Sequence, residues 1–167
     1  VNYQATKKMS IGIDFTQMDY LAHQPGGLTE GMFRFNPQQS RRDRNWFKVN
    51  WNLLALHFTH KFNTHNEFNL RLFGLSAYRY SLGFRKNGVA TIDENGERDL
   101  IKGDFENWGA EARYLKHYSI VNIPCVFLLG TRYYKGYNHS LQGYGSTGKG
   151  ADFDFVEPES KMLYDYR

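Results

Sequence analysis

Long segments in which apolar and polar side chains alternate recur along this chain, and they are joined alternately by short polar turns and by long loops. The side chains of a β-strand point to opposite faces in turn, so alternation of this kind predicts strands with one apolar face. The predicted strands cover residues 9 to about 23, 45–62, 68–85, 107–119 and 125–141.

These segments are long for strands. They run to about 13 to 18 residues, whereas strands of soluble proteins average about 5 to 6. They also exceed the ~9–11 residues that a tilted strand needs to cross the hydrocarbon core of a bilayer. No apolar run approaches the ~20 residues of a spanning helix, and the 17% aromatic content suits two membrane interfaces. The sequence therefore predicts an all-β fold, an antiparallel transmembrane β-barrel.

Loop length predicts the orientation of such a barrel, because short turns face the periplasm and long loops face outside. The turns Asn63–Glu67 and Ile120–Pro124 are accordingly expected on the periplasmic side. Residues 23–45, 86–106 and 142–167 are expected to be extracellular loops. About five strands cannot close a barrel, so residues 1–167 are expected to be part of a larger barrel domain.

The second predicted strand changes parity in its middle. Phe47, Val49, Trp51 and Leu53 share one face, but the apolar residues continue from Leu54 on the other. A one-residue shift of this kind predicts a β-bulge near Leu53–Leu54, because otherwise half of the strand would turn its polar side to lipid.

Alternation alone also fits a soluble β-sandwich or a lipocalin-like barrel, in which the apolar face covers a core. The strand lengths favour the membrane interpretation. So do arginines on the face opposite the apolar one, because a barrel interior is polar. These arginines are Arg71, Arg79, Arg113 and Arg132.

Five passages together resemble the barrel of TonB-dependent outer-membrane receptors, and most closely those of the ferric-dicitrate transporter type. The resemblance extends from about Gln17 to the end of the chain, and each passage is weak alone. The passages are QPGGLTEGMF (24–33), NPQQSRRDRNWFKVNWNL (36–53), FGLSAYRYSLGFR (73–85), RDLIKGDFENWGAEARYL (98–115) and LLGTRYYKGYNHSLQGYGSTGKGADFDF (128–155).

The resemblance implies a barrel of about 22 strands in the outer membrane of a Gram-negative bacterium. It implies a plug domain in the lumen and a TonB complex that acts through an N-terminal region absent from this stretch. Outer-membrane lipid and lipopolysaccharide would surround the wall. The imported ligand would be a ferric chelate such as ferric citrate, and no cofactor is expected to be bound by this segment. Alternatives are a passive barrel or a surface adhesin without a plug.

Six arginines are candidate ligand contacts, because guanidinium groups bind carboxylates through paired hydrogen bonds and ferric citrate complexes are anionic. The alternative for the loop arginines is a solvated surface or contact with lipopolysaccharide phosphates. The candidates are Arg41, Arg42 and Arg44 in the first long loop, Arg79 and Arg85 near the outer mouth, and Arg132 on the inner wall.

Other motifs do not support a different function. Gly143, Gly145 and Gly148 match a phosphate-loop spacing, but no helix is predicted after them. His57 and His60 are three residues apart, so on a strand they face opposite ways and no metal site is expected. Basic residues are spread through the strands rather than clustered, so nucleic acid is not an expected partner. No catalytic arrangement points to an enzyme.

Overall fold

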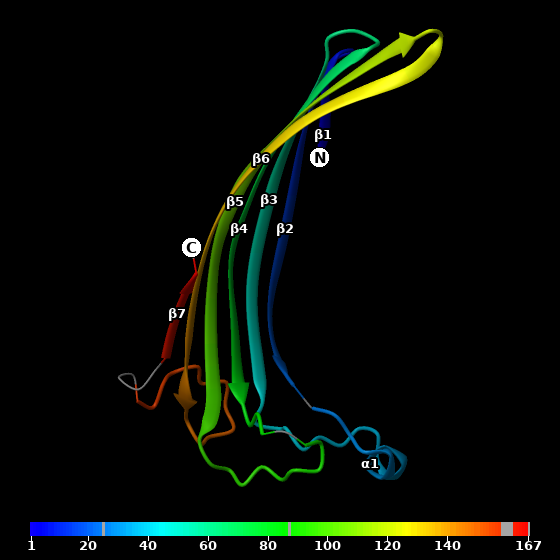
Figure 1. Ribbon diagram of the computed structural model, residues 1–167. Helices are drawn as coiled ribbons and strands as arrows, with labels where there is room; N and C mark the ends of the chain where they lie inside the picture. Colours follow the sequence, from blue (N-terminus) through cyan, green and yellow to red (C-terminus); the bar gives the residue numbers. More distant parts are fainter. Residues whose placement is uncertain (25, 87, 158–161, 167) are drawn as a thin grey trace.

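A computed structural model describes residues 1–24, 26–86, 88–157 and 162–166, with side chains up to residue 157. Seven strands form one antiparallel sheet in which every neighbour in space is also a neighbour in sequence (Figure 1). The strands are β1 (Asn2–Thr6), β2 (Met9–His23), β3 (Trp46–Lys61), β4 (Asn66–Gly83), β5 (Arg98–Ile120), β6 (Ile123–Gly145) and β7 (Met162–Tyr166).

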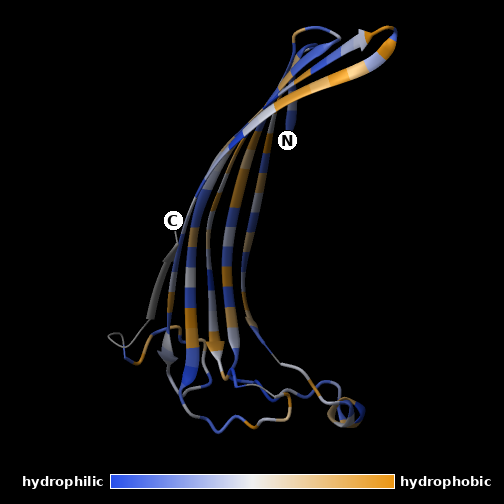
Figure 2. Ribbon diagram, viewed as in Figure 1, coloured by the Kyte–Doolittle hydropathy of each residue, from blue (hydrophilic) through white to orange (hydrophobic). Residues whose placement is uncertain are grey.

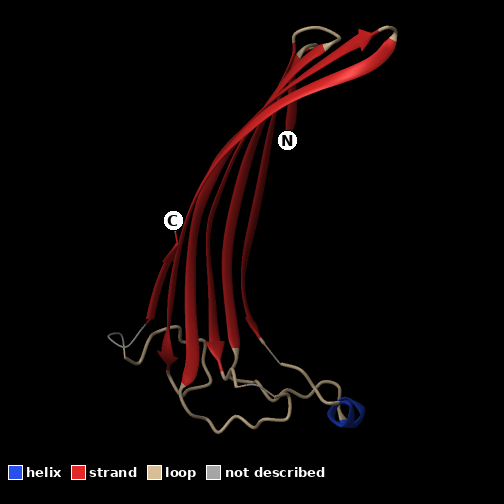
Figure 3. Cartoon of the chain, in the orientation of Figure 1, coloured by secondary structure: helices blue, strands red, loops and turns tan. Residues whose placement is uncertain are grey.

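The sheet is a single curved layer with the short turns at one end and the long loops at the other (Figure 3). A short helix, α1 (Glu30–Phe35), lies within the first long loop, and the Thr29 hydroxyl caps it by accepting a hydrogen bond from the Met32 N–H. The hairpin of β5 and β6 extends beyond the short-turn ends of the other strands (Figure 1), because β4 pairs with β5 only as far as Lys116.

The long predicted strands are confirmed, and the antiparallel all-β fold with them. β5 is longer than predicted: it begins at Arg98, inside the segment 86–106 that was expected to be a loop. The short strands β1 and β7 were not predicted, and β7 lies in the expected loop 142–167.

The predicted bulge near Leu53–Leu54 is wrong. The register between β3 and β2 and between β3 and β4 runs without a shift through both residues. The change of parity in β3 is therefore real, and the apolar side chains pass from one face of the sheet to the other at this point.

The same change occurs on β2, β4 and β5 at the same level, whereas on β6 Lys135 already occupies the row of Leu54. One face is here called face A. It includes Leu54 of β3, the residues in register with Leu54 on the other strands, and every second residue along each strand from there. Between the Leu54 level and the short-turn end, face A is predominantly apolar, with exposed Ile11, Ile13, Phe15, Leu54, Leu56, Leu72, Trp108, Leu129 and Tyr133. One step toward the loops, the next row across the sheet is polar: Gln17, Asn52, Ser76, Glu106 and Tyr137.

This apolar zone, here called the belt, has the height of a bilayer core. On β4 it lies between the polar residues Ser76 and Asn66. Ten residues at ~3.4 Å span about 34 Å along a strand, and a tilt of 35–45° reduces this to about 25 Å. Trp108 and Tyr133 form an aromatic pair near the loop-side border, with ring centroids 5.3 Å apart. In Figure 2 the hydropathy colours alternate along the strands.

The opposite face, here called face B, has the reverse distribution. Beside the belt it carries charged groups, among them Asp14, Arg71 and Glu111, and closer to the loops it carries Trp51 and Phe105. A sandwich would cover the belt with a second sheet, but all seven described strands lie in one sheet.

The few fully buried side chains lie at the loop end, not in the middle of the sheet. Leu82 and Leu100 are paired across β4 and β5 and are both 0% exposed. Segment 146–156 lies over this region: the Trp46 indole N–H donates to the Lys149 carbonyl at 2.7 Å, and the Phe153 ring lies 6.0 Å from that of Tyr80. Among the described helices, none has the length and apolar character needed to cross a membrane.

Candidate functional site

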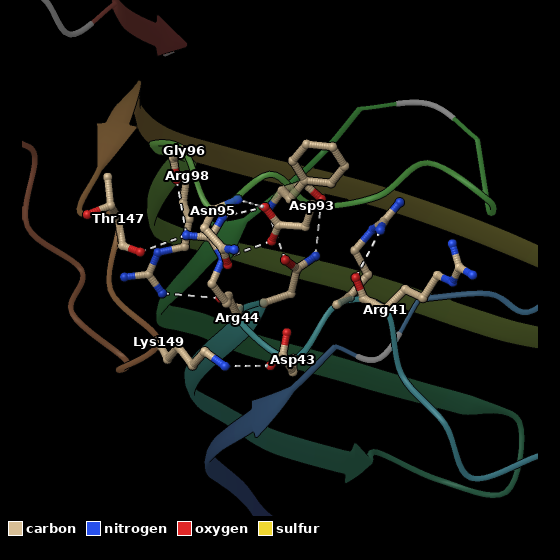
Figure 4. Close-up of polar contacts among 12 residues, drawn as sticks. Arg41, Asp43, Arg44, Asp93, Asn95, Gly96, Arg98, Thr147 and Lys149 are labelled. Carbon is tan, nitrogen blue, oxygen red and sulfur yellow. Dashed lines mark hydrogen bonds and ion pairs between the residues drawn. The ribbon is translucent and has the colours of Figure 1, made fainter.

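The three long loops are joined at the sheet end by a cluster built around Arg44 (Figure 4). Arg44 precedes β3 and is 1% exposed. Its Nε donates to Asp93 Oδ2 at 2.8 Å, and its Nη2 pairs with Asp93 Oδ1. Its Nη1 donates to the carbonyls of Gly96, at 3.0 Å, and Thr147, at 2.7 Å. One guanidinium thus links the loop before β3, the loop before β5 and the segment after β6.

Arg98, the first residue of β5, makes a second link and is 0% exposed. It donates to the Ser146 carbonyl at 2.7 Å, to the Ser146 hydroxyl at 2.8 Å and to the Gly150 carbonyl at 2.8 Å. It also donates to the Arg44 carbonyl at 3.1 Å. A buried guanidinium requires acceptors for its N–H groups, and here neutral oxygens from two loops supply them.

Arg42 and Asn45 extend the same network. Arg42 is 8% exposed, donates to the Thr91 and Gly88 carbonyls at 3.0 and 3.2 Å, and lies 4.8 Å from the Phe84 ring centre. The Asn45 amide bonds both the N–H and the carbonyl of Phe84. These contacts fix the start of the loop after β4 against the loop before β3.

The Arg44 guanidinium lowers the pKa of Asp93. Its hydrogen bonds to the carboxylate are the main cause, and burial acts in the opposite direction without prevailing. The Asn95 N–H, which donates to Asp93 at 3.0 Å, also favours the charged form. Asn95 has a positive φ of 61°, so the turn signal at Asn95–Gly96 positions this carboxylate.

Five of the six predicted ligand-contact residues lie at the loop end of the sheet, and they differ in exposure. Arg42 and Arg44 point into the loop cluster, where protein atoms engage their guanidinium groups. Arg41 is half-buried and donates to the Ala90 carbonyl at 3.0 Å. Arg79 and Arg85 are exposed at the loop end of β4 and just beyond it. Direct ligand contact by any of them stays a prediction.

Arg132 lies elsewhere, on face B beside the belt. It is in register with Glu111 of β5, which is in register with Arg71 of β4 and, beyond it, His57 of β3. Four adjacent strands thus place four polar side chains in one row across the sheet. This row lines a hollow of about 360 Å³.

The other motifs have structural explanations. Gly143 and Gly145 lie in β6, and no helix follows them in the described residues. His57 lies on face B and His60 on face A, as their spacing predicts. In the described part of the chain, no three His, Cys, Asp or Glu side chains are grouped so that they could hold a metal ion.

Sequence reasoning missed Arg98 and Asp93. Both lie in a stretch that was expected to be an irregular loop, and only the turn signal at Asn95–Gly96 marked the position. The partners of Arg98 lie about fifty residues further along the chain, at Ser146 and Gly150. No local pattern in the sequence indicates a contact over that separation.

The fold is similar to part of a known membrane transporter. The structure superimposes on the crystal structure of the ferric citrate transporter FecA in the unliganded form with a TM-score of 0.76 and 19% sequence identity. The match covers 98% of this chain and 23% of the transporter chain, so the chain spans less than a quarter of that protein. At this level of identity the similarity shows the fold: this is a section of a FecA-like antiparallel barrel wall.

The two sequence comparisons add nothing to this, since no protein-family model and no curated protein sequence matches the chain.

Proposed function

We propose that this chain is part of the wall of an outer-membrane receptor that is driven by a TonB complex. Face A would meet lipid along the belt, and face B would line the lumen. The turn Asn63–Glu67 would lie in the periplasm, and the loop cluster around Arg44 would lie outside the cell. A plug domain would lie in the lumen, and lipopolysaccharide would surround the outer part of the wall.

More particularly, we propose that the receptor imports an anionic ferric chelate, of which ferric citrate is the first candidate. The exposed guanidinium groups of Arg79 and Arg85 lie where a ligand would enter from the loop side. Arg79 also lies 6.0 Å from the Phe105 ring, a contact that orients its planar group on the inner wall.

The observation that carries the proposal is the belt itself. Its apolar side chains are exposed, Leu54 at 44% and Leu72 at 42%, although water would favour burying them. The polar row that contains His57 and Arg71 lies at the same height on face B, because these two residues directly follow Leu56 and directly precede Leu72, respectively, in sequence. A wall between lipid and a polar lumen accounts for both faces together.

The first test is fractionation of the full-length native protein. We expect it in the outer membrane, extracted only by detergent, with a gel band that shifts on boiling as closed barrels do. A soluble protein with no shift would contradict the membrane assignment.

The second test measures binding of ferric citrate to the same preparation. We expect the variants Arg79→Gln and Arg85→Gln each to weaken binding about tenfold, since each removes a charge-assisted contact. The control is Arg34→Gln, which removes an arginine that is 76% exposed and forms an ion pair with Glu30 in the same helix. Wild-type protein that binds no ferric citrate would refute this choice of ligand but not the membrane assignment.

A further inference from the structure

The row across face B, formed by His57, Arg71, Glu111 and Arg132, gathers charged groups from four adjacent strands. It lies far from the loop cluster. On β4, Arg71 is eight residues from Arg79, which corresponds to about 27 Å along the strand. Anything bound at this row would therefore already have passed the loop end.

The carboxylates near the row are already engaged. Asp14 bonds His57 Nε2 at 2.7 Å. Glu111 is flanked by Arg71 and Arg132 but pairs along its own strand with Arg113, at 2.6 Å. Arg71 and Arg132 thus lie beside two carboxylates that are already paired, Asp14 with His57 and Glu111 with Arg113.

Arg71 and Arg132 are left with weak partners. The Nε of Arg71 donates to His57 Nδ1 at 3.3 Å, so the imidazole occupies one edge of the guanidinium. Arg132 lies over the Phe73 ring at 5.2 Å from its centre. Within the part of the chain that the structure describes, neither has a carboxylate partner, and both side chains are exposed. Among the described residues, no hydrogen bond occupies their Nη groups.

The shape of the site suits a small anion with more than one carboxylate. Arg71 and Arg132 lie on either side of Glu111, so two guanidinium forks are presented from β4 and β6 toward the same hollow. Phe73 and Leu53 provide an apolar wall on the loop side. Planar guanidinium groups bind carboxylates through two parallel hydrogen bonds, which a single lysine cannot do.

We propose that Arg71 and Arg132 form a second, deeper binding site for a polycarboxylate anion on the inner wall. This inference rests on the proposed import function, in which the site would hold the chelate after it has left the outer mouth. His57, held between Asp14 and Arg71, is a positioning residue that keeps the Arg71 fork directed across the sheet.

The test uses the full-length receptor with Cys125→Ser and a single new cysteine, Ala55→Cys, in the lining of the hollow. The rate at which a methanethiosulfonate reagent modifies this cysteine is measured with no anion, with citrate and with ferric citrate. We expect either anion to slow modification about tenfold. The protection should disappear in Arg71→Gln and in Arg132→Gln, and should be partly restored in Arg71→Lys.

The matched control is Lys135→Gln, which removes a positive charge from the same strand but on face A, beside Trp108. It should leave the protection unchanged, and the heat-modifiability gel establishes that every variant is a closed barrel. Protection that persists in both arginine variants would overturn the proposal. So would a cysteine that is unreactive even without anion, because protein would then already fill the hollow.

Uptake of radioactive iron by cells separates this inference from the proposed function. If ferric citrate is imported but protects nothing, the deeper site is refuted and the import function stands. If citrate protects but no iron enters, the site stands and the import function fails. If both stand, the arginine variants should slow import about tenfold while binding at the cell surface is unchanged.

Discussion

Replacing Asp93 by Asn should release the three long loops from one another without unfolding the sheet. The substitution preserves the shape of the side chain but removes the charge that neutralises Arg44. The two side chains are 7% and 1% exposed, so the guanidinium would remain buried without a counter-charge. Removing one partner of a buried pair costs about 3–5 kcal/mol.

The effect should be local, because the pair joins loops rather than strands. A loss of about 3 kcal/mol corresponds to more than 100-fold faster opening, at 1.36 kcal/mol for each factor of ten. Hydrogen exchange of the full-length protein should show this acceleration at the loop backbone around Gly96 and Thr147, whose carbonyls Arg44 also holds. Exchange in the middle of β4 and β5 should not change.

Asp43→Asn is the matched control, since it is the same substitution in the same cluster. Asp43 pairs with Lys149 at 3.3 Å, but these side chains are 61% and 75% exposed, and exposed pairs contribute at most about 1 kcal/mol. Loop exchange should therefore change less than about fivefold. Equal exchange in the two variants would refute the idea that burial makes the Arg44–Asp93 pair a strong link.

The pH dependence of the loops has a definite sign. Because the folded pKa of Asp93 is lowered, the pair stabilises the cluster fully above the ordinary carboxyl value of about 3.9, and this contribution is lost as the pH falls below it. Loop exchange in the wild type, corrected for its intrinsic pH dependence, should accelerate below about pH 4. Asp93→Asn should remove this dependence.

Two further substitutions test the wall. Leu72→Arg places a charge in the middle of the belt and should lower the stability of the folded barrel in lipid by about 2–4 kcal/mol. Ser76→Arg, on the same face but on the loop side of the belt, should lower it by less than about 1 kcal/mol. Urea unfolding in vesicles measures both costs, and equal costs would contradict a lipid-facing belt. Gly109→Ala should cost about 1–3 kcal/mol in the same assay, because its Cβ would lie 2.6 Å from the Tyr133 carbonyl oxygen, while Gly130→Ala, with its nearest neighbour at 3.7 Å, should fold normally.

The long strands could be predicted from the sequence because alternation is a local signal. Met9–His23 was predicted with the bounds that the structure has, and β3 and β4 within two residues. The first part of β5 was missed because Lys102, Gly103 and Asp104 resemble a loop in composition. Their strand is specified by pairing with β4 and β6, which is tertiary information.

The bulge was wrongly predicted for an instructive reason. The apolar face of β3 was assumed to meet one environment along its whole length, so a change of parity required an extra residue. The structure shows that the environment changes instead, because Asn52, Ser76 and Glu106 form a polar row next to Leu54. Likewise, the sequence RRDR (41–44) indicates positive charge in the first long loop. Only the fold shows that the side chains of Arg42 and Arg44 are buried among the loops.

The abrupt border between the Leu54 row and the Asn52 row also fixes how deep the wall can sit in a membrane. Sliding the sheet by one row, two residues or about 7 Å, would immerse Gln17, Asn52, Ser76 and Glu106 together in hydrocarbon. Sliding it the other way would leave Phe15, Leu54 and Trp108 in water. Because β2, β3, β4 and β5 carry the border at the same level, the costs on the separate strands would add. In a membrane, the vertical position of this wall would therefore be set to within a single row.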